Sequence, residues 1–301
     1  MRREFCNRIE QLGERDNKVI FLSGDVGFKA LEGVQKIFGE RFINMGVAEQ
    51  NMISVAAGMA LEGYKVFCYS IAPFIVYRCL EQIRNDVCFH NLPVFIVGNG
   101  GGYGYGIMGP SHHALEDLAC LGGLPNMTAY IPAFDNDINY TLETILAESA
   151  PAYLRLGLGK YNPLLTPAGF FHPVVTPLSA QVTVAALGPI ANNVLEALEN
   201  PAIKDKADVF SVTKLPIKEL PQSFVQSIKK TKKLLVAEEH TSVGGLGQSL
   251  ASAILKENIL LNSFISLTSQ GYPEGLYGNQ GYHQQKSGLD AQSIGKLLES
   301  L

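Results

Sequence analysis

The sequence predicts an α/β protein of two domains, each a mainly parallel sheet covered by helices. Short apolar runs alternate with longer amphipathic stretches, and most runs, such as residues 93–98 (PVFIVG), are apolar throughout rather than at every second position. Strands buried on both faces have this pattern, which is typical of a parallel sheet between two layers of helices. With 301 residues, 47% of them hydrophobic and 17% charged, the chain is long enough for about two domains.

The first domain is predicted over residues 1–165. Residues 2–15 place Phe5, Ile9 and Leu12 on one face of a helix, and residues 74–88 repeat an apolar side chain every fourth position, which also favours a helix. We expect strands at 19–23, 41–45, 65–69, 93–98, 127–131 and 152–156, and further helices at 51–61 and 135–149. Residues 100–106 (GGGYGYG) are too rich in glycine for a helix or strand and predict a loop.

A linker is predicted at 166–178, because this stretch is rich in Gly, Pro and Thr and has little periodicity. The second domain follows over residues 179–301. Its expected strands are 182–187, 208–212, 233–237 and 264–267, and its expected helices are 190–199, 221–229 and 246–256. The glycine cluster at 244–247 precedes the last of these helices and could cradle an anion, although close packing explains a lone glycine cluster better.

Composition excludes several classes of function. A net charge of −4 leaves no basic stripe for nucleic acid. No apolar run approaches the roughly 20 residues that a membrane-spanning helix needs, and the polar start, Met1 to Asn17, is not a signal peptide. The five scattered cysteines form no CxxC pair, so they predict reduced thiols in a cytoplasmic protein, and no set of metal ligands stands out.

The most informative motif is GVAEQNM at residues 46–52, which places Glu49 between a short strand and a helix of small apolar residues. An acid in such a place is partly buried and needs a partner. Only Arg41 is close in sequence. A buried acid without a cation is suited to hydrogen-bonding a ligand nitrogen. The alternative is a carboxylate that stabilises the first turn of the helix.

Together with GPSHH at residues 109–113, this motif resembles the transketolase family. The resemblance spans nearly the whole chain and covers the C-terminal portion of a transketolase: the pyrimidine-binding domain followed by the transketolase C-terminal domain. It implies a thiamine diphosphate enzyme that transfers a two-carbon ketol unit from a ketose phosphate to an aldehyde acceptor.

The resemblance assigns four residues to the cofactor. Glu49 matches the glutamate that hydrogen-bonds N1′ of the aminopyrimidine and so favours the tautomer that activates the cofactor. Phe74 and Tyr77 fall where the family places aromatic rings around the pyrimidine, although both also suit a helix core. Asp25 matches an aspartate near the cofactor and the subunit contact, but it could equally be a turn residue after a strand.

The resemblance assigns further residues to the substrate. His112 matches a histidine beside the reactive carbon, where a neutral imidazole can exchange protons near pH 7. His113, the next residue, is a second candidate for contact with the substrate. Arg155 and Arg2 align with arginines that bind a substrate phosphate, a role that suits the guanidinium fork. The alignment of Arg2 rests on nearby matching positions, and the alternative for it is a surface arginine.

Two departures from the family pattern change the expectation. Gly100 and Met108 stand where the family has a histidine and an acid that bind sugar substrates, so the usual pentose phosphates are in doubt. The Gly/Tyr loop at 100–106 predicts a wider or differently shaped entrance to the substrate site. Tyr103 and Tyr105 are new candidates for hydrogen bonds to the substrate there. No Gly-Asp-Gly run occurs, although the family uses one, with a later Asn, to bind the diphosphate and Mg²⁺.

The chain is therefore expected to hold half of a cofactor site and to need an N-terminal subunit that carries the diphosphate-binding domain and the Mg²⁺. Family habit suggests an α2β2 heterotetramer, or a homodimer of this chain alone. Two other functions stay open. One is the β subunit of a 2-oxo acid dehydrogenase or a 1-deoxyxylulose-5-phosphate synthase-like enzyme, and the other is a non-catalytic assembly partner.

Overall fold

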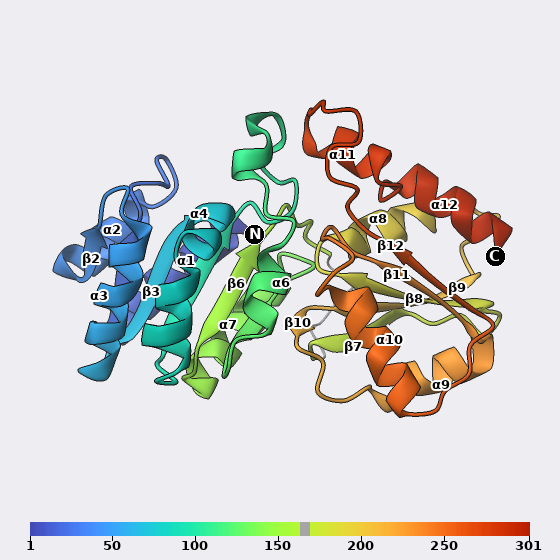
Figure 1. Ribbon diagram of the computed structural model, residues 1–301, viewed down its shortest axis with the longest axis horizontal. Coiled ribbons are helices and arrows are strands. Elements are labelled where there is room, and N and C mark those ends of the chain that lie inside the picture. Colours follow the sequence, from blue (N-terminus) through green and yellow to red (C-terminus); the bar gives the residue numbers. More distant parts are fainter. Residues whose placement is uncertain (163–168) are drawn as a thin grey trace.

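The computed structural model describes residues 1–162 and 169–301, and it contains two mainly parallel sheets side by side (Figure 1). The first sheet has the order β10-β5-β6-β4-β3-β1-β2. Its strands are β1 (Val19–Ser23), β2 (Phe42–Asn44), β3 (Lys65–Ile71), β4 (Val94–Asn99), β5 (Thr128–Tyr130), β6 (Ala152–Leu156) and β10 (Lys214–Leu215). All pair in parallel except β10, which joins the edge from the second half of the chain.

Helices cover both faces of this sheet. One face packs on α1 (Arg2–Arg15), α2 (Glu32–Phe38) and α7 (Asp137–Glu148). The other packs on α3 (Glu49–Leu61), α4 (Ala72–Tyr77), α5 (Leu80–Gln82), the π-helix η2 (Ile83–Cys88) and α6 (Asp117–Gly122). Short 3₁₀ turns lie at η1 (Gly39–Arg41), η3 (Gly106–Met108) and η4 (Pro110–His112).

The second sheet has the order β12-β11-β8-β9-β7, with β7 antiparallel at its edge. Its strands are β7 (Phe171–Val175), β8 (Val182–Leu187), β9 (Ala207–Val212), β11 (Lys233–Ala237) and β12 (Ser263–Leu267). Helices α8 (Ile190–Ala197) and α12 (Ala291–Ser300) cover one face, and α9 (Gln222–Thr231) and α10 (Leu246–Lys256) pack on the other. The short α11 (Gln280–Lys286) lies above the sheet (Figure 1). The predicted fold class is therefore confirmed.

One apolar core runs from the first sheet into the second. It joins Leu121 of α6 and Ile131, which follows β5, to Leu187 of β8 and Phe210 of β9. Residues 171–175, inside the segment expected to be a linker, form β7, while residues 163–168 of that segment lie outside the described residues. The two halves thus share a buried interface that fixes the loops of one against the loops of the other.

The predicted helix at 74–88 is the clearest difference from expectation. It begins at Ala72, ends at Tyr77, and resumes as α5 and then the π-helix η2. Irregular helical turns of this kind often occur at functional sites. The break leaves Arg78 at the end of α4, where its side chain turns back toward the carboxyl ends of the strands.

Candidate functional site

The candidate residues gather at the carboxyl ends of the parallel strands, where open α/β sheets usually bind ligands. Asp25 follows β1, Glu49 begins the helix after β2, and Phe74 lies in the helix after β3. The glycine loop and His112 follow β4. The alternation of strand and helix in the sequence brings these segments to one edge, which is the upper edge in Figure 1.

Glu49 is the buried acid at the centre of this edge. Its side chain is 3% exposed, and Ser70 Oγ donates to its Oε1 over 3.2 Å. Arg78 Nη1 donates to its Oε2, also over 3.2 Å. The expectation that Glu49 lacks a cation is therefore wrong. Arg41, the cation that is near in sequence, instead donates to backbone carbonyls at the end of α1 and the start of β1.

Space beside Glu49 depends on a glycine. A Cβ at Gly24 would lie 3.1 Å from Ser70 Oγ and 3.4 Å from Glu49 Cγ, so a larger residue would press on the pair. The next residue, Asp25, has a φ of 57° and is exposed. Its Oδ1 accepts from Asn44 Nδ2 over 2.8 Å, which ties the loop after β1 to the loop that carries Glu49.

Phe74 is the aromatic face of the site. The guanidinium carbon of Arg78 lies 4.1 Å from its ring centroid, and the ring of His112 meets it edge-on at 5.0 Å. Ser111 Oγ lies 3.0 Å from His112 Nδ1 and helps to fix that imidazole. Glu49, Phe74 and His112 therefore lie in one cluster with Ser70 and Arg78, two residues that the sequence analysis did not single out.

Tyr77 lies on the same helix as Phe74 but has a different partner. Its hydroxyl donates to Glu116 Oε2 over 3.0 Å and accepts from the Glu116 backbone N–H over 3.1 Å. Burial, followed by the charge of Asp117, raises the pKa of Tyr77. The structure thus places the Tyr77 hydroxyl against the loop before α6 rather than against Glu49.

The glycine loop presents one of its two tyrosines to the site. Tyr105 lies over Gly100, where an added Cβ would come within 2.2 Å of the tyrosine ring, and the φ of +76° at Gly100 also disfavours a side chain. Asn99 Nδ2 donates to the Tyr105 hydroxyl over 2.8 Å, and the Tyr105 ring lies 5.7 Å from that of His112. The Tyr105 ring therefore fills the space beside Gly100.

Tyr103 and His113 point the other way and attach the loop to the second half of the chain. Tyr103 is fully buried, its hydroxyl donates to the Gly271 carbonyl over 3.1 Å, and its ring stacks on His283 at 4.4 Å. His113 lies between the Tyr272 hydroxyl, 2.6 Å away, and the Gly106 carbonyl, 2.8 Å away. Burial lowers the pKa of His113. In this conformation neither side chain has a polar atom free for a substrate.

Arg155 is likewise buried, and its guanidinium is hydrogen-bonded to other groups of the chain. Its Nε donates to Asp117 Oδ2 over 2.8 Å, and its Nη2 donates to the carbonyls of Ala114 and Glu239 over 2.6 and 3.1 Å. The cavity beside it holds only about 10 Å³, which is room for one water and not for a phosphate. Arg2, in contrast, is exposed at the start of α1 and lies beside the Tyr69 hydroxyl.

The glycine cluster at 244–247 does not bind an external anion in this structure, because a carboxylate of the chain itself takes that place. Glu238 is fully buried and accepts from the backbone N–H groups of Leu246 and Gly247 over 2.7 and 2.8 Å. A Cβ at Gly245 would lie 2.3 Å from Glu238 Oε2, which explains that glycine by packing. Burial raises the pKa of Glu238 to about 7.

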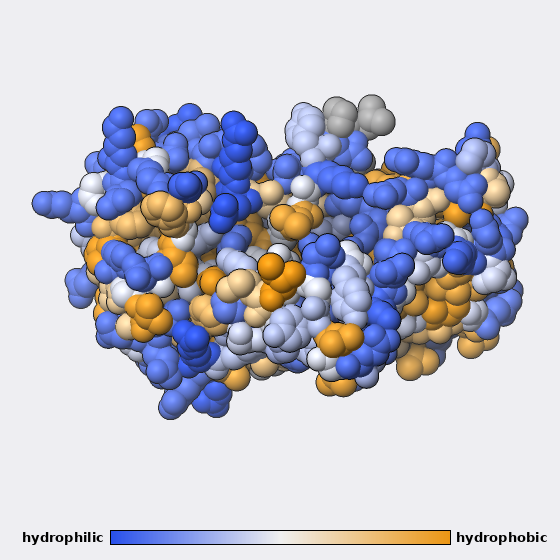
Figure 2. All heavy atoms as spheres, turned by 90° about the horizontal axis from the view of Figure 1, so that it is seen from above, coloured by the Kyte–Doolittle hydropathy of each residue, from blue (hydrophilic) through white to orange (hydrophobic). Residues whose placement is uncertain are grey.

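The loops at this edge expose several large apolar side chains, and Figure 2 shows apolar groups among polar ones on this face. The exposed apolar residues of these loops are Phe28, Val47, Ile107, Met108, Leu158, Tyr161, Leu276 and Tyr277.

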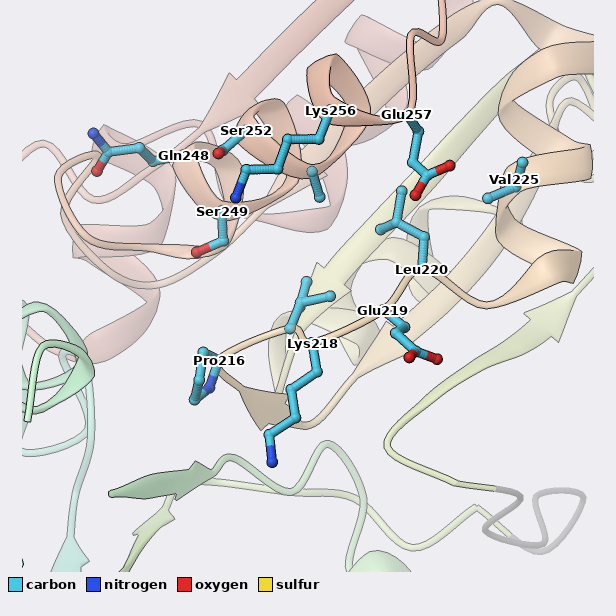
Figure 3. Close-up of a pocket in the computed structure, with 12 residues that line it drawn as sticks. Pro216, Lys218, Glu219, Leu220, Val225, Gln248, Ser249, Ser252, Lys256 and Glu257 are labelled. Carbon is cyan, nitrogen blue, oxygen red and sulfur yellow. The ribbon is translucent and has the colours of Figure 1, made fainter. Parts of the chain in front are cut away.

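A separate groove of about 720 Å³ lies between α10 and residues 216–220 (Figure 3). Lys218 and Glu219 line one side of it and Lys256 and Glu257 the other, so both charges are present on its walls. It shares no residue with the cluster around Glu49. Its mixed charge selects no class of ligand, and we assign it no role.

Within residues 1–162 and 169–301, every helix is too short or too polar to span a lipid bilayer. No group of three or more His, Cys, Asp or Glu side chains in that part of the chain is arranged to hold a metal ion.

Comparisons with known proteins give matches that agree with one another. The model of the transketolase pyrimidine binding domain matches residues 1–163. The chain is 28% identical to one subunit of the apulose-4-phosphate transketolase of Actinobacillus succinogenes, over 88% of this chain and 86% of the relative. It is 30% identical to a putative transketolase C-terminal section of Methanocaldococcus jannaschii, over 99% and 95%.

Among solved structures, a split gene transketolase described as an inactive beta4 tetramer superposes with a TM-score of 0.82 and 29% identity. The match covers 99% of this chain and 96% of that one. A fold shared over nearly the whole of both chains places the cluster around Glu49 in the same architecture as that of the split-gene protein.

Proposed function

The chain belongs to the transketolase family, and on that premise we propose that it is the C-terminal subunit of a thiamine diphosphate-dependent ketol transferase. Family membership implies dependence on thiamine diphosphate and a transketolase-type transfer. We further propose that the enzyme moves a two-carbon ketol unit from a ketose phosphate to an aldehyde acceptor. The observation that carries it is the pairing of buried Glu49 with the aromatic face of Phe74.

The residues present fit the pyrimidine half of this cofactor. A flat heterocycle needs an aromatic face and a carboxyl at its edge, and a planar guanidinium already makes both contacts at this place. When bound, thiamine diphosphate supplies the carbon nucleophile and the electron sink for breaking a carbon–carbon bond. Glu49 would hold the proton at N1′, Ser70 would orient the Glu49 carboxyl, and Phe74 would stack on the ring. Asp25 would hold the loop after β1 beside the cofactor, through its bond from Asn44. Tyr77 would line the cofactor site from the same helix as Phe74.

The substrate would enter past His112, which stands edge-on to Phe74 and beside Tyr105. We propose that His112 exchanges a proton with a substrate oxygen and that the exposed guanidinium of Arg2 contacts a substrate phosphate. The buried contacts of Arg155, His113 and Tyr103 support a positioning role for these three residues, since they fix the loop that carries His112.

A second subunit would hold the diphosphate and Mg²⁺. The sequence lacks the Gly-Asp-Gly run, and the loops around the site expose apolar side chains suited to a partner. We propose an N-terminal transketolase subunit as this partner, in an α2β2 complex. The similar split-gene protein is described as an inactive beta4 tetramer, which supports the view that this chain alone is inactive. Five free thiols fit a cytoplasmic enzyme.

The test is ketol transfer by the assembled complex with Glu49→Gln. Glu62→Gln is the matched control, because Glu62 is an exposed acid just past the other end of the same helix. We expect Glu49→Gln to lower kcat at least about a hundredfold, which corresponds to roughly 2.7 kcal/mol of barrier. The control should match wild type. Activity of Glu49→Gln within about tenfold of wild type would show that Glu49 is not the N1′ partner.

A further inference from the structure

Arg78 is the cation that the sequence analysis did not connect to the site. It follows the last residue of α4, and the helix breaks directly after it, so its side chain is not held in a regular turn. Its guanidinium contacts Phe74 and Glu49 at the same time, yet the side chain is 46% exposed. The side chain therefore contacts two residues of the site while nearly half of its surface stays open to solvent.

The two contacts of Arg78 coincide with those proposed for the cofactor. The guanidinium is flat, lies over the Phe74 ring and donates one hydrogen bond, from Nη1, to the Glu49 carboxylate. An aminopyrimidine is also flat, also stacks on an aromatic face and also bonds a carboxyl at its edge. Both groups cannot use the same face of Phe74 and the same oxygen of Glu49.

We propose that Arg78 is an autoinhibitory side chain that occupies the pyrimidine half-site until thiamine diphosphate displaces it. This proposal rests on the proposed function, because it takes the pyrimidine position from it. Displacement needs no backbone movement, since rotation of the exposed side chain clears both Phe74 and Glu49.

The arrangement also explains how the free subunit keeps a buried acid. A buried carboxylate with only the Ser70 hydroxyl as its partner would be costly, and Arg78 supplies a cation while the cofactor is absent. The same contact lowers the apparent affinity for the cofactor, because only chains with Arg78 displaced can bind it. If nine chains in ten hold Arg78 in place, the apparent affinity falls about tenfold.

The test measures the binding of thiamine diphosphate with saturating Mg²⁺ to the assembled complex, by titration calorimetry and stopped-flow fluorescence. Arg78→Met keeps an unbranched, flexible side chain but removes the charge and the N–H donors. Arg78→Lys keeps the charge without the flat fork. Arg84→Met is the matched control, since Arg84 is an exposed arginine that bonds only its neighbour Asn85 in the described contacts.

We expect Arg78→Met to bind the cofactor about five- to tenfold more tightly and with a faster association rate, and Arg78→Lys to lie between it and wild type. The control should not differ from wild type. Unchanged or weaker binding by Arg78→Met would overturn the proposal while the proposed function stands. Binding by none of the complexes, the control included, would overturn the proposed function and the inference with it.

A second measurement, on the free chain, tests whether Arg78 contacts Glu49 in the absence of the cofactor. Urea denaturation of Glu49→Gln, Arg78→Met and the double variant should give non-additive shifts of the midpoint, because the two side chains are in contact. Additive shifts would show that Arg78 does not occupy the site in solution.

Discussion

Arg155 Nε donates to Asp117 Oδ2 over 2.8 Å, and both side chains are almost wholly buried between the two halves of the chain. Further bonds from Arg155 reach the carbonyls of Ala114 and Glu239, so one guanidinium joins the loop before α6 to the end of β11. The ion pair therefore acts as a tie that positions the His112 loop.

The first prediction concerns this tie. Arg155→Met leaves Asp117 as an uncompensated buried charge, so we expect a loss of about 3–5 kcal/mol in the free energy of unfolding, measured by urea denaturation. Arg155→Met combined with Asp117→Leu should lose less than the sum of the two single changes. A variant of Arg155 with full stability but a raised KM for a phosphorylated substrate would instead make Arg155 a phosphate ligand.

The second prediction separates the two tyrosines of the glycine loop. Tyr105→Phe keeps the ring beside His112 but removes the hydroxyl that Asn99 holds, so KM for the sugar substrate should rise about 3- to 10-fold. Tyr103→Phe is the matched control, because its hydroxyl bonds the Gly271 carbonyl. It should cost about 1 kcal/mol of stability and leave KM unchanged. The reverse pattern would place Tyr103 at the substrate.

The third prediction compares two neighbouring histidines. His112→Asn should lower kcat/KM about a hundredfold without changing cofactor affinity, because the proposal gives His112 a proton to exchange with substrate. His113→Asn should mainly lower the melting temperature, since His113 bonds Tyr272 and the Gly106 carbonyl. Steady-state kinetics and thermal unfolding of both variants test these two roles. Equal kinetics for His112→Asn and wild type would show that His112 exchanges no proton with the substrate.

The fourth prediction concerns pH and stability through His240. Burial lowers the pKa of His240 to about 4, and its ring accepts from the Ala119 N–H, which requires the neutral form. The unfolded chain takes up this proton near pH 6.5 and the folded chain does not, so stability from His240 is present above pH 6.5 and is lost as pH falls toward 4. The loss should be roughly 3 kcal/mol.

The measurement is the difference in unfolding free energy between wild type and His240→Asn from pH 8 to pH 4. Taking the difference removes the contribution of groups distant from His240. Glu238 lies 4.0 Å from the His240 ring, and its raised pKa acts in the opposite direction, so Glu238→Gln is made in both proteins before they are compared. Wild type should lose its advantage over the variant as the pH falls. A difference that is constant across this range would show that His240 is not held neutral.

Much of this architecture could be predicted from the sequence, because apolar runs and helical periodicity report burial directly. The strands at 19–23, 152–156, 182–187 and 233–237 have the predicted bounds. The small edge strands β7 and β10 were not predicted. They are short, partly exposed and defined by pairing with distant partners, which leaves little local pattern.

The candidate site was harder to predict where it depends on contacts between distant segments. Glu49 and Phe74 stand in motifs, but the partner of Glu49 lies 29 residues away, at a break that periodicity cannot locate. Tyr103 and Tyr105 are equivalent in the sequence of the loop. Docking of the loop onto residues 271–283 buries Tyr103 and leaves Tyr105 beside His112.

The central claim is that this chain holds one half of a thiamine diphosphate site, and its most direct test is a titration of that cofactor with Mg²⁺. The isolated chain, the isolated N-terminal subunit and their equimolar mixture would be titrated by calorimetry. We predict tight binding by the mixture alone, with loss of that binding when Glu49→Gln and Phe74→Ala are combined. Binding by the isolated chain as tight as that by the mixture would contradict the claim.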